Sequence, residues 1–133
     1  MTNNHPNVVA VREAFEAADR GDASKIVDLF SDDFTVAAWK IEGGQRLLDK
    51  GEYFQAMAIV GKLDVCKTEL VDAHTIGDDI VAGVFRCDRQ LGDIKTVTDI
   101  LIAFRFKDGK VDRAAEVCSL DFEKFWAATG ITE

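Results

Sequence analysis

Two segments of the chain carry charged residues whose types and spacing suit acid–base chemistry. Arg86 and Asp88 are two positions apart, so in a strand their side chains lie on one face. Glu116 lies in a later segment that also predicts a strand. Two carboxylates with a cation between them could open an epoxide, because that reaction needs an acid and a base on opposite faces of the ring.

Glu116 is the one charged residue in its predicted row. It shares a strand face with Ala114, Cys118 and Leu120. A carboxylate in an apolar wall is costly when ionised, so we expect it to be hydrogen-bonded, ion-paired or protonated near neutral pH. Two placements remain open. In a pocket wall Glu116 would be the main catalytic candidate, whereas at a solvated mouth or an interface it would not be.

The placement of Arg86 and Asp88 also has two solutions. If their row faces a pocket, the pair joins Glu116 as catalytic residues. Gly83, Phe85 and Cys87 form an equally good inward row on the same predicted strand, and that choice turns Arg86 and Asp88 outward. The pair would then form an ion pair at the surface or at an interface.

No motif for a metal or another cofactor is visible. The three cysteines (Cys66, Cys87 and Cys118) are far apart, and the two histidines are His5 and His74. These residues form no ligand spacing, and no glycine-rich loop suggests phosphate binding. We therefore expect no metal and no cofactor. An odd number of separated cysteines also suits reduced thiols in the cytoplasm.

The net charge and the short apolar runs limit the classes of partner that the protein is expected to bind. A formal charge of −8 disfavours a nucleic-acid surface or an anionic membrane surface. The uninterrupted apolar runs are only a few residues long, and the first residues lack the basic and apolar regions of a signal peptide. We expect a cytoplasmic protein without nucleic-acid or membrane partners.

The helices and strands predicted to position these residues indicate an α+β fold. The 133 residues fit a single domain, residues 1–133. Apolar residues at helical spacing predict helices over about residues 7–20, 24–30 and 51–60, and a short terminal segment packs over 122–128. Alternation and turn residues predict strands over about residues 34–39, 63–76, 80–89, 95–106 and 111–120. Helices followed by a run of strands indicate segregated α+β elements.

Three stretches of the sequence carry a family resemblance. Residues 17–22 (AADRGD), 26–34 (IVDLFSDDF) and 104–111 (FRFKDGKV) resemble nuclear transport factor 2-like domains of the SnoaL-like type, which include ketosteroid isomerases. The resemblance implies a cystatin-like cone: a curved antiparallel sheet with N-terminal helices over its concave face, a deep pocket, and usually a dimer. These motifs are helix stops, turns and hairpins, so they specify the fold and not the activity.

The resemblance supplies several chemistries against which the residues can be compared. Ala38, Phe15 and Ile102 stand where ketosteroid isomerases need a base, a tyrosine and a second acid, so the chain is not an isomerase of that kind. With only His5 and His74, a dehydratase mechanism based on two histidines and an aspartate is weak. Glu116 lies near the acid of the limonene epoxide hydrolases, which pair two acids with an arginine.

The remaining expectations concern the pocket lining and the outer sheet face. The side chains expected to line the pocket are mainly aromatic: Phe15, Trp39, Tyr53, Phe54, Met57, Phe104, Cys118 and Trp126. The row Asp99, Leu101, Ala103 and Arg105 is expected on the outer face, which is the dimerising face in this family. A homodimer is therefore expected.

Two functions remain open at this point. The first is a cofactor-independent acid–base enzyme of the epoxide hydrolase, cyclase or isomerase class, acting on a small, largely apolar molecule. Its catalytic residues would be Glu116, Asp88 and Arg86. The second is a non-catalytic dimer that binds a small ligand or a partner. A void around Glu116 would favour the enzyme, and a pocket filled by its own side chains would favour the binding module.

Overall fold

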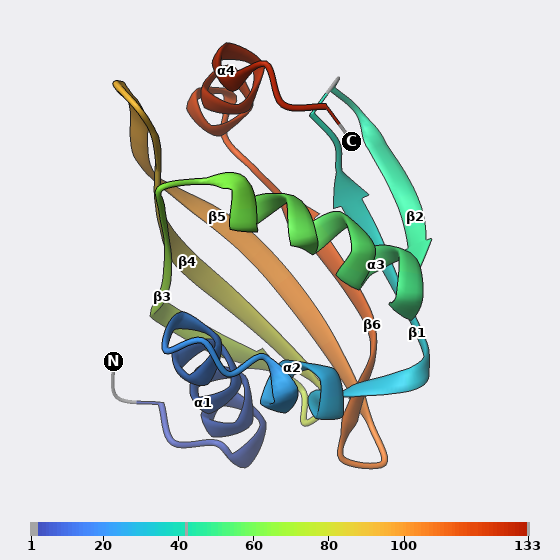
Figure 1. Ribbon diagram of the computed structural model, residues 1–133. Helices are drawn as coiled ribbons and strands as arrows, with labels where there is room; N and C mark the ends of the chain where they lie inside the picture. The colour runs from blue at the N-terminus through green and yellow to red at the C-terminus, as the bar shows by residue number, and fades with distance from the viewer. Residues whose placement is uncertain (1–2, 42, 133) are drawn as a thin grey trace.

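A curved six-stranded sheet with helices over one face makes up the computed structural model, which describes residues 3–41 and 43–132 (Figure 1). The helices are α1 (Pro6–Asp19), α2 (Ser24–Leu29), α3 (Lys50–Met57), the 3-10 helix η1 (Ala58–Lys62) and α4 (Leu120–Thr129). The strands are β1 (Phe30–Trp39), β2 (Gln45–Asp49), β3 (Val65–Ile76), β4 (Ile80–Leu91), β5 (Ile94–Lys107) and β6 (Lys110–Val117). The α+β class and the curved sheet are confirmed.

The strand order is β2-β1-β6-β5-β4-β3, and it corrects the sequence prediction in two ways. Strand β1 pairs with β6 in parallel, so the sheet is mixed and not wholly antiparallel. Strand β2, which pairs with β1 at the sheet edge, was not predicted. Only Leu48 is buried among its five residues, so β2 lacks the alternation that marks a half-buried strand.

The core lies between the concave face of the sheet and the first helix. In β5 the buried row is Ile100, Ile102, Phe104 and Phe106, as alternation predicted. Helix α1 buries Val8, Val11, Ala14 and Phe15 against this face, and Figure 1 shows α1 and α3 crossing the same side of the sheet. The ring of Phe15 lies 4.7 Å from that of Phe85, centroid to centroid.

The β5–β6 hairpin sets the phase of the last strand. Asp108 and Gly109 both have positive φ, 53° and 80°, and Lys107 pairs with Lys110 across this tight turn. The register shifts by one residue between Arg105 and Phe106, and this bulge lies at Asp112 of β6. Two guanidinium nitrogens of Arg105 donate to the carboxylate of Asp112, at 2.9 Å each.

That bulge decides where the later residues of β6 point. Strict alternation from Val111 would turn Glu116 outward, but the extra residue reverses the phase and buries Ala114 and Glu116. The predicted row does not extend to Leu120, because β6 ends at Val117 and Leu120 is exposed at the start of α4.

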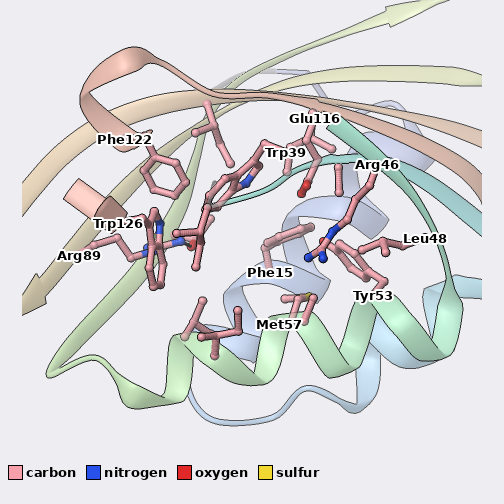
Figure 2. Close-up of a pocket in the computed structure, with 18 residues that line it drawn as sticks. Phe15, Trp39, Arg46, Leu48, Tyr53, Met57, Arg89, Glu116, Phe122 and Trp126 are labelled. Carbon is pink, nitrogen blue, oxygen red and sulfur yellow. Dashed lines mark hydrogen bonds between the residues drawn. The ribbon is translucent and has the colours of Figure 1, made fainter. Parts of the chain in front are cut away.

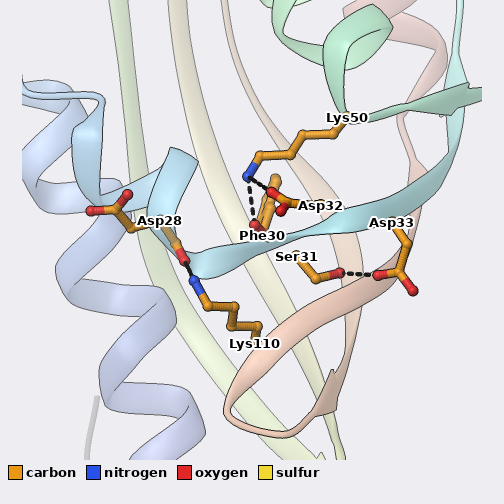
Figure 3. A network of polar contacts seen from close by, with 7 residues as sticks. All are labelled: Asp28, Phe30, Ser31, Asp32, Asp33, Lys50 and Lys110. Atoms are coloured by element: carbon orange, nitrogen blue, oxygen red, sulfur yellow. Dashed lines mark hydrogen bonds and ion pairs between the residues drawn. The ribbon is translucent and has the colours of Figure 1, made fainter.

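Two lysines hold the junction where α2 becomes β1 (Figure 3). Lys50 Nζ donates to the carbonyl oxygen of Phe30 at 2.7 Å, and Lys110 Nζ donates to that of Asp28 at 2.7 Å. Lys50 begins α3 and Lys110 begins β6, so these bonds tie both elements to the start of β1. The carbonyl groups at the end of a short helix gain partners in this way.

Candidate functional site

A pocket lies between the concave sheet face, α3 with η1, and α4 (Figure 2). Its volume is about 130 Å³. An apolar cavity of about 150 Å³ holds benzene, so this space fits a molecule of roughly one ring. Most of the wall is apolar, and its charged or hydroxyl-bearing members are Arg46, Tyr53, Thr68, Arg89 and Glu116.

Among the described residues, Glu116 is the acidic member of this wall. It is 8% exposed, and its backbone pairs with that of Ile102 in the middle of the sheet. Burial raises the pKa of its carboxyl from the ordinary 4.5 to about 7, and the hydrogen bond from Tyr53 opposes that rise. Figure 2 shows the carboxyl pointing into the pocket, on the side where Tyr53 and Arg46 also lie.

Tyr53 is the hydrogen-bond partner that the sequence did not reveal. It is buried on α3, whose start is fixed by a capping box in which Asp49 and Glu52 satisfy each other's backbone N–H groups. Burial and the neighbouring Glu116 raise the pKa of Tyr53 well above its ordinary value of 10. The hydroxyl therefore stays protonated at neutral pH and can donate to the carboxylate.

Arg86 and Asp88 do not reach the pocket. Strand β4 turns Gly83, Phe85 and Cys87 inward, so the alternative in which the pair faces outward is the one observed. Arg86 Nε lies 3.3 Å from the Asp99 carboxylate of β5, and both side chains are about half exposed. The pocket placement that their proposed catalytic role required is thus corrected.

Arg89 extends the inward row of β4 and was missed. It is 6% exposed, although it carries a charge. Its Nη1 donates to the Lys67 carbonyl at 2.6 Å, and its Nη2 donates to Thr68 Oγ1 at 2.8 Å. The guanidinium lies 5.9 Å from the centroid of the Phe122 ring. Continuing the Gly83, Phe85, Cys87 alternation by one step would have found it.

The predicted lining residues divide into two groups. Five of them line the pocket: Phe15, Trp39, Tyr53, Met57 and Trp126. The other three lie elsewhere: Phe104 is packed under α1 against Phe15 and Phe85, Phe54 packs toward Phe30, and the thiol of Cys118 faces Glu123. Arg46 of β2 also lines the pocket, and it was missed because β2 itself was not predicted.

The described residues contain no group of three or more histidine, cysteine or acidic side chains that could hold a metal ion. Within the same residues, no helix combines the length and apolar character needed to cross a membrane.

Comparison with protein-family models and with curated proteins finds no match in sequence. Solved structures, in contrast, match over almost the whole chain. Bal32a, from a soil-derived mobile gene cassette, is 21% identical with a TM-score of 0.78, over 90% of this chain and 95% of that one. IdmH, a candidate polyketide cyclase from Streptomyces antibioticus, is 15% identical with a TM-score of 0.76, over 96% of this chain and 100% of that one.

A nuclear transport factor 2-like protein of unknown function from Burkholderia pseudomallei is 14% identical, with a TM-score of 0.76. The match covers 93% of this chain and 98% of that one. At such identities the likeness concerns the fold and not the activity. The chain has the nuclear transport factor 2-like fold that its sequence motifs indicated.

Proposed function

We propose that the protein is a cofactor-independent acid–base enzyme that acts on a small, largely apolar molecule, with Glu116 as the group that carries the proton. The observation that supports this most strongly is a buried carboxyl with a pKa of about 7 in a mainly apolar pocket. A general acid or base works best when its pKa lies near the working pH. Strongly shifted pKa values of this kind cluster at functional sites.

The arrangement favours proton transfer over epoxide opening. Glu116 can take a proton from one atom of a bound molecule and return it to another, which is the chemistry of isomerisation and of many cyclisations. An epoxide hydrolase of the two-acid and arginine kind has less support, because Arg86 and Asp88 lie on the outer face. The shared fold with IdmH, a candidate polyketide cyclase, agrees with the cyclase option.

A non-catalytic binding module is the second candidate. The observation that favours it is the small volume of about 130 Å³, because ligand pockets usually measure roughly 300–1,000 Å³. Trp39, Phe122 and Trp126 fill part of the space with an aromatic cluster whose ring centroids lie 5.1 to 6.3 Å apart. Such a pocket could hold a ligand without transforming it.

We also propose that the protein is a cytoplasmic homodimer. Val97, Leu101 and Val117 are 60%, 53% and 60% exposed, and all three lie on the outward face of β5 and β6. An exposed apolar face on a sheet is a typical docking surface for a second copy. The free cysteines Cys66, Cys87 and Cys118 support a reducing compartment.

Deuterium exchange into single-ring ketones such as cyclohexanone tests the proposed chemistry. In D2O, the Glu116 carboxylate would remove a proton from the carbon beside the carbonyl, and the electron pair would move onto the oxygen. After exchange with solvent, the carboxyl would return a deuteron to the same carbon. We expect the parent protein to accelerate exchange above the buffer rate and Glu116→Gln to abolish the acceleration.

Glu69→Gln is the matched control, because Glu69 lies exposed on β3 outside this pocket. It should exchange at the parental rate. If ketones that bind the parent exchange at no more than the buffer rate, the binding module becomes the better account.

A further inference from the structure

Trp126 and Arg89 each present to the pocket wall a buried hydrogen-bond donor that finds no acceptor among the described residues. The indole Nε1 of Trp126 and the Nε of Arg89 are buried, and neither has a hydrogen-bond partner among the residues that the structure describes. The two side chains are 2% and 6% exposed, and both line the pocket. Leaving a buried donor unpaired costs free energy, so an atom that could accept from either of them would be stabilised there.

Both donors are held in place by their surroundings. The remaining guanidinium nitrogens of Arg89 donate to the Lys67 and Asp88 carbonyls and to Thr68 Oγ1. The indole of Trp126 packs against Trp39 and Phe125, with centroid distances of 6.0 and 5.5 Å. Both side chains pack around Phe122: the Arg89 guanidinium lies 5.9 Å from the centroid of that ring, and the Trp126 ring centroid lies 6.3 Å from it. Figure 2 labels both residues at the same end of the pocket. A ligand that binds there would therefore pay little free energy to immobilise these two side chains.

The charge at this end favours an oxygen that carries negative character. No carboxylate of the described residues lies within ion-pair distance of Arg89, whose polar contacts are all to neutral oxygens. The Asp19 carboxylate interacts with Arg89 electrostatically from beyond that distance. A buried cation that makes no direct ion pair still attracts an acceptor with a full or partial negative charge. Carbonyl, phenolate and carboxylate oxygens share that property.

Glu116 lies toward the other end of the same pocket. Arg89 pairs with Thr96 of β5, whereas Glu116 pairs with Ile102, six positions further along that strand. The two ends therefore differ in chemistry: one offers a titrating carboxyl beside a tyrosine hydroxyl, and the other offers two fixed N–H donors. A molecule that spans them needs an acceptor oxygen at one end and a site for proton transfer toward the other.

We propose that Trp126 Nε1 and Arg89 Nε form an anchor for an acceptor oxygen, so that the pocket selects single-ring compounds carrying a carbonyl or a similar oxygen. This inference rests on the proposed function for the role of Glu116 and adds the class of substrate. The anchor holds the oxygen at this end and directs the remainder of the ring toward Glu116 at the other end. A ring of the same size without an acceptor leaves both donors unpaired and binds more weakly.

Two probes of nearly the same shape test the anchor. Cyclohexanone carries an acceptor oxygen, and methylenecyclohexane carries a CH2 group in its place. We expect the parent protein to bind cyclohexanone about tenfold or more tightly, as measured by titration. Trp126→Phe should reduce this preference several-fold. Leu120→Ala, at an exposed position outside the pocket on the same helix as Trp126, should keep it.

A second measurement uses only the parent protein, so it does not depend on whether a variant folds. The indole N–H signal of Trp126 in an NMR spectrum of the parent should move downfield with cyclohexanone and not with methylenecyclohexane, because only the ketone accepts a hydrogen bond. Equal affinities for the two probes, or an unmoved indole signal when the ketone is bound, would overturn the anchor. A preference that survives Trp126→Phe but vanishes in Glu116→Gln would overturn it too, by assigning the oxygen to the other end.

These readouts separate the anchor from the catalytic proposal. Both measure binding alone, so discrimination between the probes without deuterium exchange would support the anchor and count against catalysis. Exchange that Glu116→Gln abolishes, without any discrimination, would overturn the anchor and leave the acid–base function standing.

Discussion

Replacing Glu116 by glutamine should change how the stability of the protein depends on pH. The carboxyl has a pKa of about 7 in the folded chain against an ordinary value of 4.5. Because the folded pKa is raised, the contribution of this group to stability is fully present below pH 4.5. It is lost progressively as the pH rises toward about 7, where the folded protein must ionise a buried group.

The size of the expected change in stability follows from the same two pKa values. A rise from 4.5 to about 7 corresponds to about 3 kcal/mol at ~1.36 kcal/mol for each pKa unit. Glutamine keeps the shape of the side chain and does not titrate, so Glu116→Gln removes this loss. Relative to the parent, the variant should therefore gain about 3 kcal/mol in free energy of unfolding between about pH 4.5 and about pH 8.

Urea denaturation at several pH values measures this difference. Every other titrating group is common to both proteins, so subtracting the two curves isolates Glu116. Glu69→Gln, at an exposed position, controls for the loss of a surface charge. If the free energies of unfolding of the parent and of Glu116→Gln ran parallel across this range, the carboxyl would be hydrated and the reasoning from its burial would be wrong.

Three further changes follow from the same structure. Tyr53→Phe removes the hydrogen bond that favours the ionised carboxylate, so the midpoint of Glu116 titration should move above about pH 7 in an NMR titration; a lower midpoint would contradict the contact. Phe104→Ala should lower the free energy of unfolding by about 3–5 kcal/mol in urea denaturation, whereas Leu47→Ala, at an exposed site on β2, should change it by less than about 0.5 kcal/mol. Leu101→Lys places a charge in the proposed interface, so light scattering should show a dimer for the parent and a monomer for the variant; a monomeric parent would refute the dimer.

Local patterns predicted most of the fold. The alternation in β5, the helical spacing of α1 and the Asp108-Gly109 turn all act between near neighbours, and all are observed. Strand β2 is the exception, because a five-residue edge strand with one buried side chain carries almost no periodic signal. Arg46 was missed for the same reason.

The site depends on contacts that no local pattern contains. Tyr53 meets Glu116 only because α3 crosses the sheet in front of β6, and the sequence separation hides that contact. Arg89 was missed because a charged residue at the end of a strand is most often solvated, whereas here neutral oxygens of β3 and the Phe122 ring receive its guanidinium. The inward direction of Glu116 depends on the bulge at Asp112, which shifts the phase of β6.

The most direct test of the central claim is a titration of the Glu116 side-chain carboxyl by carbon-detected NMR, assigned by comparison with Glu116→Gln. Burial in the apolar pocket predicts an apparent pKa of about 7, well above those of exposed glutamates in the same spectrum. Such a value would place a group able to both donate and accept a proton at neutral pH inside the pocket. An apparent pKa near 4.5 would place the carboxyl in water and contradict the proposed acid–base function.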